Sequence, residues 1–544
     1  MHDGGVNLLV RAGLSGVAAA AAALGVAELV AVFTGPLSAP LLAVGGVVVD
    51  SAPPPVKDFG VAVFGVHDKT ALITGTAILL AAYAWLLGYL ALRSWWLAVS
   101  GIALFGLIGV AASVTRHDAG VVAALPALVG AALAVPVLRY LLSLATRPDA
   151  VRAPAPAHAA APVSAGTGGY ASPGNGAGSA ETTSSAGDSY DQEARRRFLK
   201  GLGIVVGFAA VSGIGGRLLT GRRAVSAARD RVVLPAARQG APVVPPDAQA
   251  PGAVSYVTSN ADFYRIDTSL YPPQVDPSTW ALRIHGMVRR PITMTWEQLL
   301  QRPMVERYVT LACVSNEVGG QLIGNARWLG TPIKALLDEA QPLPDADQVV
   351  QRSVDGWTCG SPTAVLRDGR DALLAVGMNG RPLPVEHGFP VRMVVPGLYG
   401  YVSACKWITE IELTRFADFD AYWVPRGWSA QAPIKTQSRI DTPRDGAERP
   451  AGTVTVAGVA WAQHTGIAKV ELQVDGGAWA EATLAGTVST DTWRQWHYTW
   501  QATPGTHALR VRATDKSGYT QTGEPRPPAP DGATGWHSIQ VTIA

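Results

Sequence analysis

Apolar runs dominate the first 145 residues, and they constrain the fold more than any other feature. This part carries very few charges, whereas the remainder has the composition of a soluble protein. A helix needs roughly 20 apolar residues to cross a bilayer. Four runs are long enough: Leu8–Phe33, Leu72–Leu92, Trp95–Val114 and Val121–Leu144. A fifth apolar run, Leu37–Val49, is too short to span, and we expect it to be interfacial or re-entrant. The pattern predicts an N-terminal bundle of four transmembrane helices over residues 1–145.

A further membrane anchor is predicted after a linker. Residues 146–194 are rich in Ala, Pro, Gly and Ser and lack apolar periodicity, so we expect a disordered linker. Arg195–Lys200 then precedes the apolar run Gly201–Gly216, and its RRxFLK pattern resembles a twin-arginine export signal. The alternative is a plain basic stop beside a helix. In both cases the arginines stay on the cytoplasmic side. We therefore expect residues 195–222 to be a fifth anchor in the cell membrane, with everything after it extracytoplasmic.

Charge and cysteine content argue against several classes of function. A net charge of +3 gives no support for a nucleic-acid partner. Three cysteines without a CxxC pair argue against a disulfide framework or a zinc site as the basis of the fold. CxxCH is absent from the sequence, and His67 and His117 near span ends do not establish a matched ligand pair. No haem is expected.

One thiol stands where a site can form. Tyr308–Ala312 is β-branched and apolar, so it predicts a buried strand that ends at Cys313. A polar, turn-rich segment follows, and its loops can enclose the thiol. A thiolate is a soft, strongly donating metal ligand. The alternative for a lone cysteine is a small buried hydrophobe.

Cys313–Asn316 and Gly324–Gly330 resemble the molybdenum-cofactor segment of the sulfite oxidase family. In that family the cysteine sulfur binds molybdenum, and a molybdopterin dithiolene supplies two more sulfurs. The resemblance implies that Cys313 is the catalytic metal ligand in a molybdopterin domain over residues 223–430. It also implies a Mo-molybdopterin cofactor.

A second stretch resembles the family's phosphate-binding pattern. Glu386–Arg392 and Pro396–Ile408 match the segments that hold the cofactor phosphate. Arginine offers a phosphate a bidentate fork, and lysine adds a point charge. The resemblance assigns phosphate contacts to His387, Arg392, Ser403 and Lys406. By the same resemblance, other cofactor contacts fall on Asn260, Phe263, Tyr264 and Ser353.

The carboxyl-terminal part alternates in period two. Thr453–Trp461, Ile467–Gly477 and His507–Asp515 are short strands with Gly and Asp turns, which predicts a β-sandwich. Asp475–Gly477 is expected to be a hairpin turn. Residues 431–544 resemble the family's immunoglobulin-like dimerisation domain, which implies a homodimer.

The expected architecture is therefore an α-helical transmembrane bundle, an α+β molybdopterin domain and an immunoglobulin-like β-sandwich. The expected function is a membrane-anchored molybdenum oxidoreductase that transfers an oxygen atom on a small oxoanion or a sulfoxide. Electrons would pass through a separate redox partner or the quinone pool. The alternative is a non-catalytic membrane receptor that uses the immunoglobulin-like domain.

The substrate is less constrained than the cofactor. Asn316-Glu317 stands where the family carries arginines that hold an anionic substrate. A carboxylate beside the site repels sulfite unless another cation compensates. Either another arginine serves, or the substrate is neutral, such as a sulfoxide.

Overall fold

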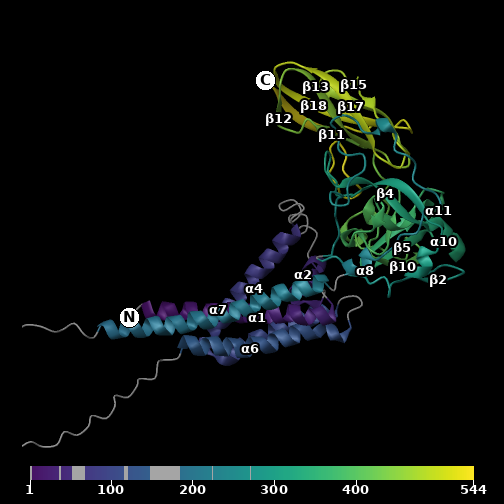
Figure 1. Cartoon of the computed structure of the whole chain (residues 1–544). Helices are drawn as coiled ribbons and strands as arrows, with labels where there is room; N and C mark the ends of the chain where they lie inside the picture. Colours follow the sequence, from purple (N-terminus) through teal and green to yellow (C-terminus); the bar gives the residue numbers. More distant parts are fainter. Residues whose placement is uncertain are drawn as a thin grey trace, which may run out of the picture. The chain divides into compact units, whose positions relative to one another are not determined.

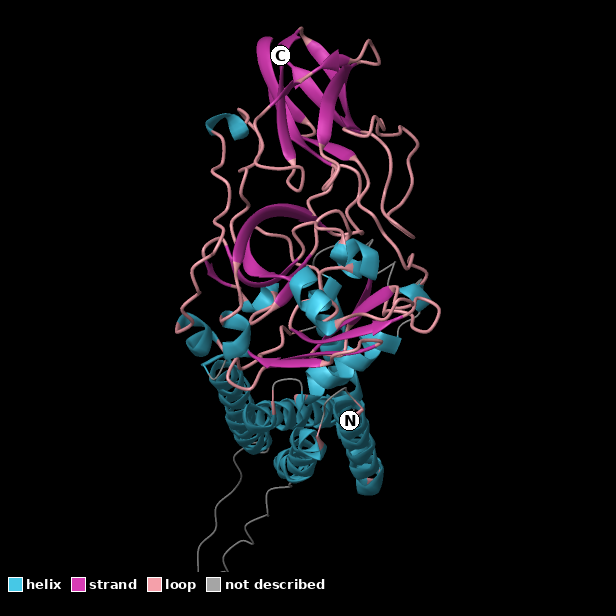
Figure 2. Cartoon of the chain, turned by 90° about the vertical axis from the view of Figure 1, so that its right-hand side faces the viewer, coloured by secondary structure: helices cyan, strands magenta, loops and turns pink. Residues whose placement is uncertain are grey.

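The structure is a computed structural model that describes residues 3–35, 38–51, 68–115, 120–146, 184–222, 225–269 and 271–544. It divides into two compact units, Met1–Arg222 and Arg223–Ala544. Figures 1 and 2 show that the first unit is helical, while the strands of the described chain belong to the second. This order matches the expected fold class.

The first unit is built from long apolar helices. They are α1 (Asp3–Thr34), α2 (Pro40–Ser51), α4 (Asp68–Arg93), α5 (Trp95–Val114), the short 3₁₀ helix η3 (Val121–Ala124), α6 (Leu125–Thr146) and α7 (Ser184–Arg222). Among the described residues, five helical segments are long and apolar enough to cross a membrane. They are Leu8–Thr34, Ala71–Arg93, Trp95–Val114, Val121–Thr146 and Arg195–Leu219. Helix α1 packs against α4, α6 and α7. The predicted runs are thus helical, and their composition is that of a membrane protein.

The linker prediction is wrong at its carboxyl end. Helix α7 begins at Ser184, so residues 184–194 are helical. Gln192, Glu193 and Ala194 favour helix, which allows the apolar anchor to extend towards the amino terminus. The rest of the predicted linker, residues 147–183, lies outside the described residues, as do His67 and His117. Helix α2 has 12 residues, which is too short for a span.

One mixed sheet, one antiparallel sheet and several short helices form the first part of the second unit. One sheet has the order β2-β1-β10-β5-β6, and the other has the order β3-β4-β7-β8 with β9 beside β7. The strands are β1 (Ala281–Gly286), β2 (Ile292–Thr295), β3 (Val305–Ala312), β4 (Ile323–Pro332), β5 (Gln348–Ser353), β6 (Thr358–Pro362), β7 (Leu373–Met378), β8 (Arg381–Pro382), β9 (Arg392–Val394) and β10 (Ile408–Thr414). The helices are α8 (Ser226–Asp230), η4 (Pro246–Ala248), α9 (Trp296–Leu300), α10 (Ile333–Ala340), α11 (Thr363–Arg367), η5 (Val385–His387), η6 (Gly400–Val402) and η7 (Val424–Arg426).

Strand β3 has one partner strand only among the described residues. It pairs with β4 in antiparallel register, with Thr310 opposite Asn325, and its other side is the edge of the sheet. The carboxyl-terminal half of β3 is buried on both faces, which explains why its sequence is continuously apolar or β-branched. Cys313 follows directly after this strand, as predicted.

A β-sandwich completes the second unit. Its sheets have the orders β11-β13-β17-β16 and β12-β19-β18-β14-β15. The strands are β11 (Gln437–Thr442), β12 (Ala447–Arg449), β13 (Gly452–Trp461), β14 (Ile467–Val474), β15 (Ala480–Glu481), β16 (Thr483–Leu484), β17 (Arg494–Ala502), β18 (Gly505–Asp515) and β19 (His537–Ile543). Alternate residues from both sheets fill one core, including Trp496, Leu472 and Val541. Asp475 and Gly476 have positive φ in the turn between β14 and β15, so the predicted hairpin is present.

Candidate cofactor site

Most of the predicted site residues line one cavity of about 130 Å³ in the second unit. They are Phe263, Tyr264, Cys313, Ser353, His387, Arg392 and Lys406. They come from the segment before β1, the end of β3, the end of β5, and the region from η5 to β10. Residues of the two motifs, which are far apart in the sequence, therefore lie around the same cavity.

Cys313 presents its thiol at the end of β3. Its backbone N–H donates to Leu322 O (2.9 Å), and its carbonyl accepts from Asn316 N (3.1 Å), which closes a tight loop around the residue. Burial raises the pKa of the Cys313 thiol, while hydrogen bonds from Ser315 and the charge of Lys406 partly offset this effect. The thiol of Cys313 is therefore neutral in this structure, and a bound metal ion would take the place of its proton.

Arg392 is a buried cation that no carboxylate neutralises within the described part of the chain. Its side chain donates to the carbonyl oxygens of His387 (3.2 Å) and Met393 (3.3 Å), and it lies 5.0 Å from the centre of the Trp328 ring. Burial lowers its pKa to about 10, so it stays charged at neutral pH. Such a charge is costly to bury unless an anion binds it.

Lys406 stands in the same cavity with a different partner. Its Nζ donates to Asp267 Oδ2 (2.7 Å) and to Glu386 O (3.3 Å). Burial lowers the pKa of Lys406 to about 8, although Asp267 opposes this shift. Asp267 also pairs with Arg265 at 3.0 Å.

Gly388 allows Arg392 and Lys406 to approach each other. Its φ is +107°, and a Cβ placed on it would lie 3.0 Å from Arg392 Cβ and 3.1 Å from Lys406 Cβ. The glycine of the motif is therefore required by both its backbone conformation and the space beside it.

His387 is held as a neutral donor. Its Nε2 lies 3.0 Å from the carbonyl oxygen of Asn260, which can only accept, so Nε2 carries the proton. Burial, together with the charge of Arg392, lowers the pKa of His387 to about 4. At neutral pH the ring of His387 is uncharged, and its Nδ1 remains as a hydrogen-bond acceptor.

Two predicted contacts do not line the cavity. Asn260 accepts from Asn379 Nδ2 (2.7 Å) through its side chain and supports His387 through its backbone. The Ser403 hydroxyl donates to Tyr399 O (2.9 Å) and is fully buried. In this structure both side chains stabilise the walls of the cavity.

Unlike Asn260 and Ser403, Ser353 faces the cavity. It is 4% exposed and lines the cavity, yet its Oγ finds no hydrogen-bond partner within the described chain. A buried unpaired hydroxyl normally indicates a missing partner. The hydroxyl of Ser353 and the guanidinium of Arg392 together fit a ligand with several acceptor oxygens, such as a phosphate.

The motifs missed other residues that face the cavity. Asp267, Asp355, Trp357, Tyr401 and Trp423 also line it. Asp355 follows β5 in a turn, and a carboxylate there can accept from the amino group of a pterin. The sequence could have indicated Asp355 as a lining residue, because it closely follows Ser353 at the end of β5.

Glu317 does not place the carboxylate in the cavity that its sequence position suggested. Glu317 is exposed and lies outside the cavity lining, because the loop after Cys313 turns its side chain towards solvent. The carboxylates that do face the cavity are Asp267 and Asp355.

Two protein-family models and several known proteins match parts of this sequence. The model of the oxidoreductase molybdopterin binding domain matches residues 269–423, and that of the bacterial Ig domain matches residues 437–511. An uncharacterized oxidoreductase, YuiH, from Bacillus subtilis is 31% identical over 165 residues, which cover 30% of this chain and 79% of that protein. The chain belongs to the sulfite oxidase family of molybdopterin oxidoreductases.

Other relatives in this family carry named activities. Mitochondrial sulfite oxidase from Mus musculus is 29% identical over 343 residues, which cover 53% of this chain and 62% of that protein. The catalytic subunit MsrP of the protein-methionine-sulfoxide reductase from Gluconobacter oxydans is 30% identical over 216 residues, covering 35% of this chain and 65% of that protein. The chain thus spans about three fifths of the length of the sulfite oxidases that it matches. Among solved structures, the sulfane dehydrogenase SoxCD from Paracoccus pantotrophus aligns with a TM-score of 0.47 and 22% identity, over 53% of this chain and 81% of that one.

Family membership supports the molybdenum cofactor and the oxidoreductase class. It does not favour the alternative of a receptor without catalytic function.

Proposed function

We propose that the protein is a membrane-anchored molybdenum oxidoreductase that transfers an oxygen atom on a small sulfoxide or oxoanion. The observation that carries the proposal is the pairing of two features in one cavity. A buried thiol ends strand β3, and a buried arginine and an unpartnered serine hydroxyl stand in the same lining. Binding of a molybdenum-loaded molybdopterin requires a ligand for the metal and a site for the phosphate.

In this proposal the chain binds and orients the cofactor. Cys313 supplies a sulfur ligand, Arg392 and Lys406 bind the phosphate, and Ser353 donates to it. Asp355 accepts from the pterin. The bound centre would supply two-electron oxygen-atom transfer, while the protein positions the substrate. Tyr264 keeps its proton, because burial raises its pKa, and it can donate a hydrogen bond into the cavity.

The charges of the lining favour a neutral substrate. Arg392 and Lys406 are the only arginine or lysine side chains among the described residues that line the cavity, and the phosphate occupies both in this proposal. Asp267 and Asp355 face the same space. A small anion such as sulfite would find no uncommitted cation there, so a sulfoxide is the better candidate. The methionine-sulfoxide reductase relative is consistent with this choice.

The proposal places the catalytic part outside the cytoplasm of the cell membrane, with the arginines at 195–197 inside. Electrons would come from a separate redox partner or the quinone pool, without a haem in this chain. The resemblance also implies a homodimer, which sedimentation of the solubilised protein would test. A reporter fused after Ala544 tests the topology: a reporter active only outside the cytoplasm should work, and activity of a cytoplasm-only reporter would contradict the placement.

The deciding experiment is a metal analysis followed by a substrate screen. The full chain, purified in detergent, should contain molybdenum and molybdopterin. With artificial electron donors it should reduce methyl sulfoxides faster than it oxidises sulfite with artificial acceptors. Protein without molybdenum after expression in a molybdopterin-producing host would reject the function. A preference for sulfite would reject the neutral substrate only.

A further inference from the structure

Strand β3 ends directly before Cys313, and the immunoglobulin-like domain covers the carboxyl-terminal part of its outer edge. At Thr310, three residues before the cysteine, the backbone N–H donates to Asp491 O (3.0 Å), and the carbonyl accepts from Gln463 Nε2 (3.0 Å). An edge strand leaves such groups unpaired unless another element supplies partners. Here the partners belong to a different domain.

The side chain of Thr310 adds a third link. Its Oγ1 accepts from Trp493 N (2.8 Å) and donates to Asn325 Oδ1 (3.1 Å) on the neighbouring strand β4. Thr310 is 1% exposed, so water cannot replace these contacts. Gln463 follows β13, and Asp491 and Trp493 precede β17, so both contacting segments lie at one end of the same sheet.

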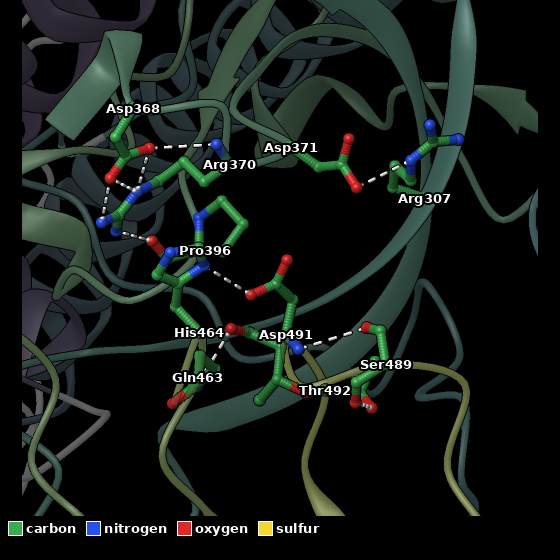
Figure 3. A network of polar contacts seen from close by, with 11 residues as sticks. Arg307, Asp368, Arg370, Asp371, Pro396, Gln463, His464, Ser489, Asp491 and Thr492 are labelled. Carbon is green, nitrogen blue, oxygen red and sulfur yellow. Dashed lines mark hydrogen bonds and ion pairs between the residues drawn. The ribbon is translucent and has the colours of Figure 1, made fainter. Parts of the chain in front are cut away.

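Figure 3 shows this end of the sandwich, with Gln463, His464, Asp491, Ser489 and Thr492 drawn as sticks. The segment is itself held in place. The His464 ring pairs with the Asp491 carboxylate at 3.4 Å, and Asp491 N donates to Ser489 Oγ (3.2 Å). The contacts to β3 therefore come from a fixed surface.

The loop after Cys313 is held by the same domain. Arg439 donates to Gly320 O (2.8 Å), and Arg439 is fixed by the buried carboxylate of Asp441 at 2.7 Å. Gly319 has a φ of +79°, and a Cβ there would lie 2.1 Å from Cδ2 of His537. The immunoglobulin-like domain thus contacts the chain on both sides of Cys313.

We propose that the immunoglobulin-like domain positions Cys313 for the metal, with Thr310 as a positioning residue. This inference rests on the proposed role of Cys313 as the molybdenum ligand. The domain completes the edge of β3 before the cysteine and fixes the loop after it. A displaced ligand changes the overlap between sulfur and metal, and small displacements lower rates strongly.

The test uses Thr310→Val in the full, molybdenum-loaded chain. This change removes the hydroxyl and keeps the shape. We expect the sulfur-to-molybdenum charge-transfer absorption to shift and kcat to fall by roughly tenfold or more, with little change in KM. In apo protein, amide hydrogen exchange of the peptide 305–313 should accelerate. Thr310→Ser, which keeps the hydroxyl, should restore both the spectrum and kcat.

A matched control is Thr436→Val. The Thr436 hydroxyl is also buried and donates to Asp515 Oδ2 (2.6 Å), but it lies within the sandwich. This variant should lose stability without a change in spectrum or in exchange of peptide 305–313. If Thr310→Val does not accumulate, Gln463→Met carries the same test and leaves the sequence of β3 intact.

The outcomes separate this inference from the proposed function. A wild-type protein that binds molybdenum but lacks the charge-transfer band would reject Cys313 as ligand. A wild-type band that Thr310→Val and Gln463→Met leave unchanged, together with unchanged exchange and kcat, would overturn the positioning role alone.

Discussion

Lys406 donates from Nζ to Oδ2 of Asp267 across 2.7 Å, and both side chains are almost fully buried. The ion pair does not compensate for the loss of hydration, since burial still lowers the pKa of Lys406 to about 8. Lys406 therefore loses its proton at mildly alkaline pH. The charge at this end of the cavity, where we propose that the cofactor phosphate binds, is therefore sensitive to alkaline conditions.

Binding of molybdopterin by the apo protein should weaken as pH rises above 8. Below this value Lys406 is charged and attracts the phosphate, and above it the lysine must first take up a proton. The phosphate is already a dianion over this range. We expect the affinity to fall by up to about tenfold for each step of one in pH. Quenching of tryptophan fluorescence would measure it, and Lys406→Arg should remove the dependence because arginine stays charged. A dependence that persists in the arginine variant would assign it to another group.

Arg392→Met should lower cofactor retention more than it lowers stability. The arginine has no carboxylate partner within the described chain, so its removal leaves no buried charge behind. Loss of a charge-assisted contact to phosphate should cost roughly 2–3 kcal/mol of binding. Molybdenum content per protein measures cofactor retention, and the melting temperature of the apo form measures stability.

Arg439→Met is the matched comparison. Arg439 is buried against Asp441, so its loss leaves a carboxylate unpaired in the interior. We expect a clear drop in the melting temperature, by the mechanism that makes a broken buried pair costly. Full molybdenum occupancy in Arg392→Met would show that this residue does not hold the phosphate.

Cys313 should be the only cysteine whose loss ends catalysis. A serine hydroxyl is a poor donor to molybdenum at neutral pH, so Cys313→Ser should fold and lack activity. Cys359 and Cys405 are fully buried, and their thiols contact each other. Cys359→Ser and Cys405→Ser should keep most of the activity, with Cys405→Ser binding cofactor more weakly because it adjoins Lys406. An active Cys313→Ser enzyme would place the metal on another residue.

Stability should fall between about pH 6.5 and pH 4 partly through His537. Its Nδ1 accepts from Ile440 N (3.0 Å), which requires an unprotonated nitrogen, and burial lowers its pKa to about 4. Over this range the unfolded chain binds a proton that the folded chain does not, so acid favours unfolding. A tenfold difference in proton affinity between the two states corresponds to about 1.4 kcal/mol of stability. Urea unfolding at several pH values would measure the slope, and His537→Gln should reduce it. An equal slope in both proteins would exclude His537.

The sequence predicted the order of elements, and its motifs marked residues that the structure brings into one cavity, for clear physical reasons. Apolar runs and period-two alternation are local signals, and Cys313 and Arg392 stand in motifs with fixed spacing. The contributions of Asp267 and Asp355 could not be found in this way, because long-range packing brings them to the cavity. Ser403 shows the converse: its motif is matched, yet its hydroxyl donates to Tyr399 O and the residue does not line the cavity.

The outer edge of β3, which residues from a later part of the chain cover, has a consequence for biosynthesis. A ribosome delivers Cys313 long before it delivers Gln463, Trp493 and His537, which brace the strand and its loop. During that interval Gln239 can bond to the start of the outer edge of β3, but the part next to Cys313 lacks these partners. If Cys313 binds the metal as proposed, we expect stable insertion of the cofactor to follow completion of the carboxyl-terminal domain.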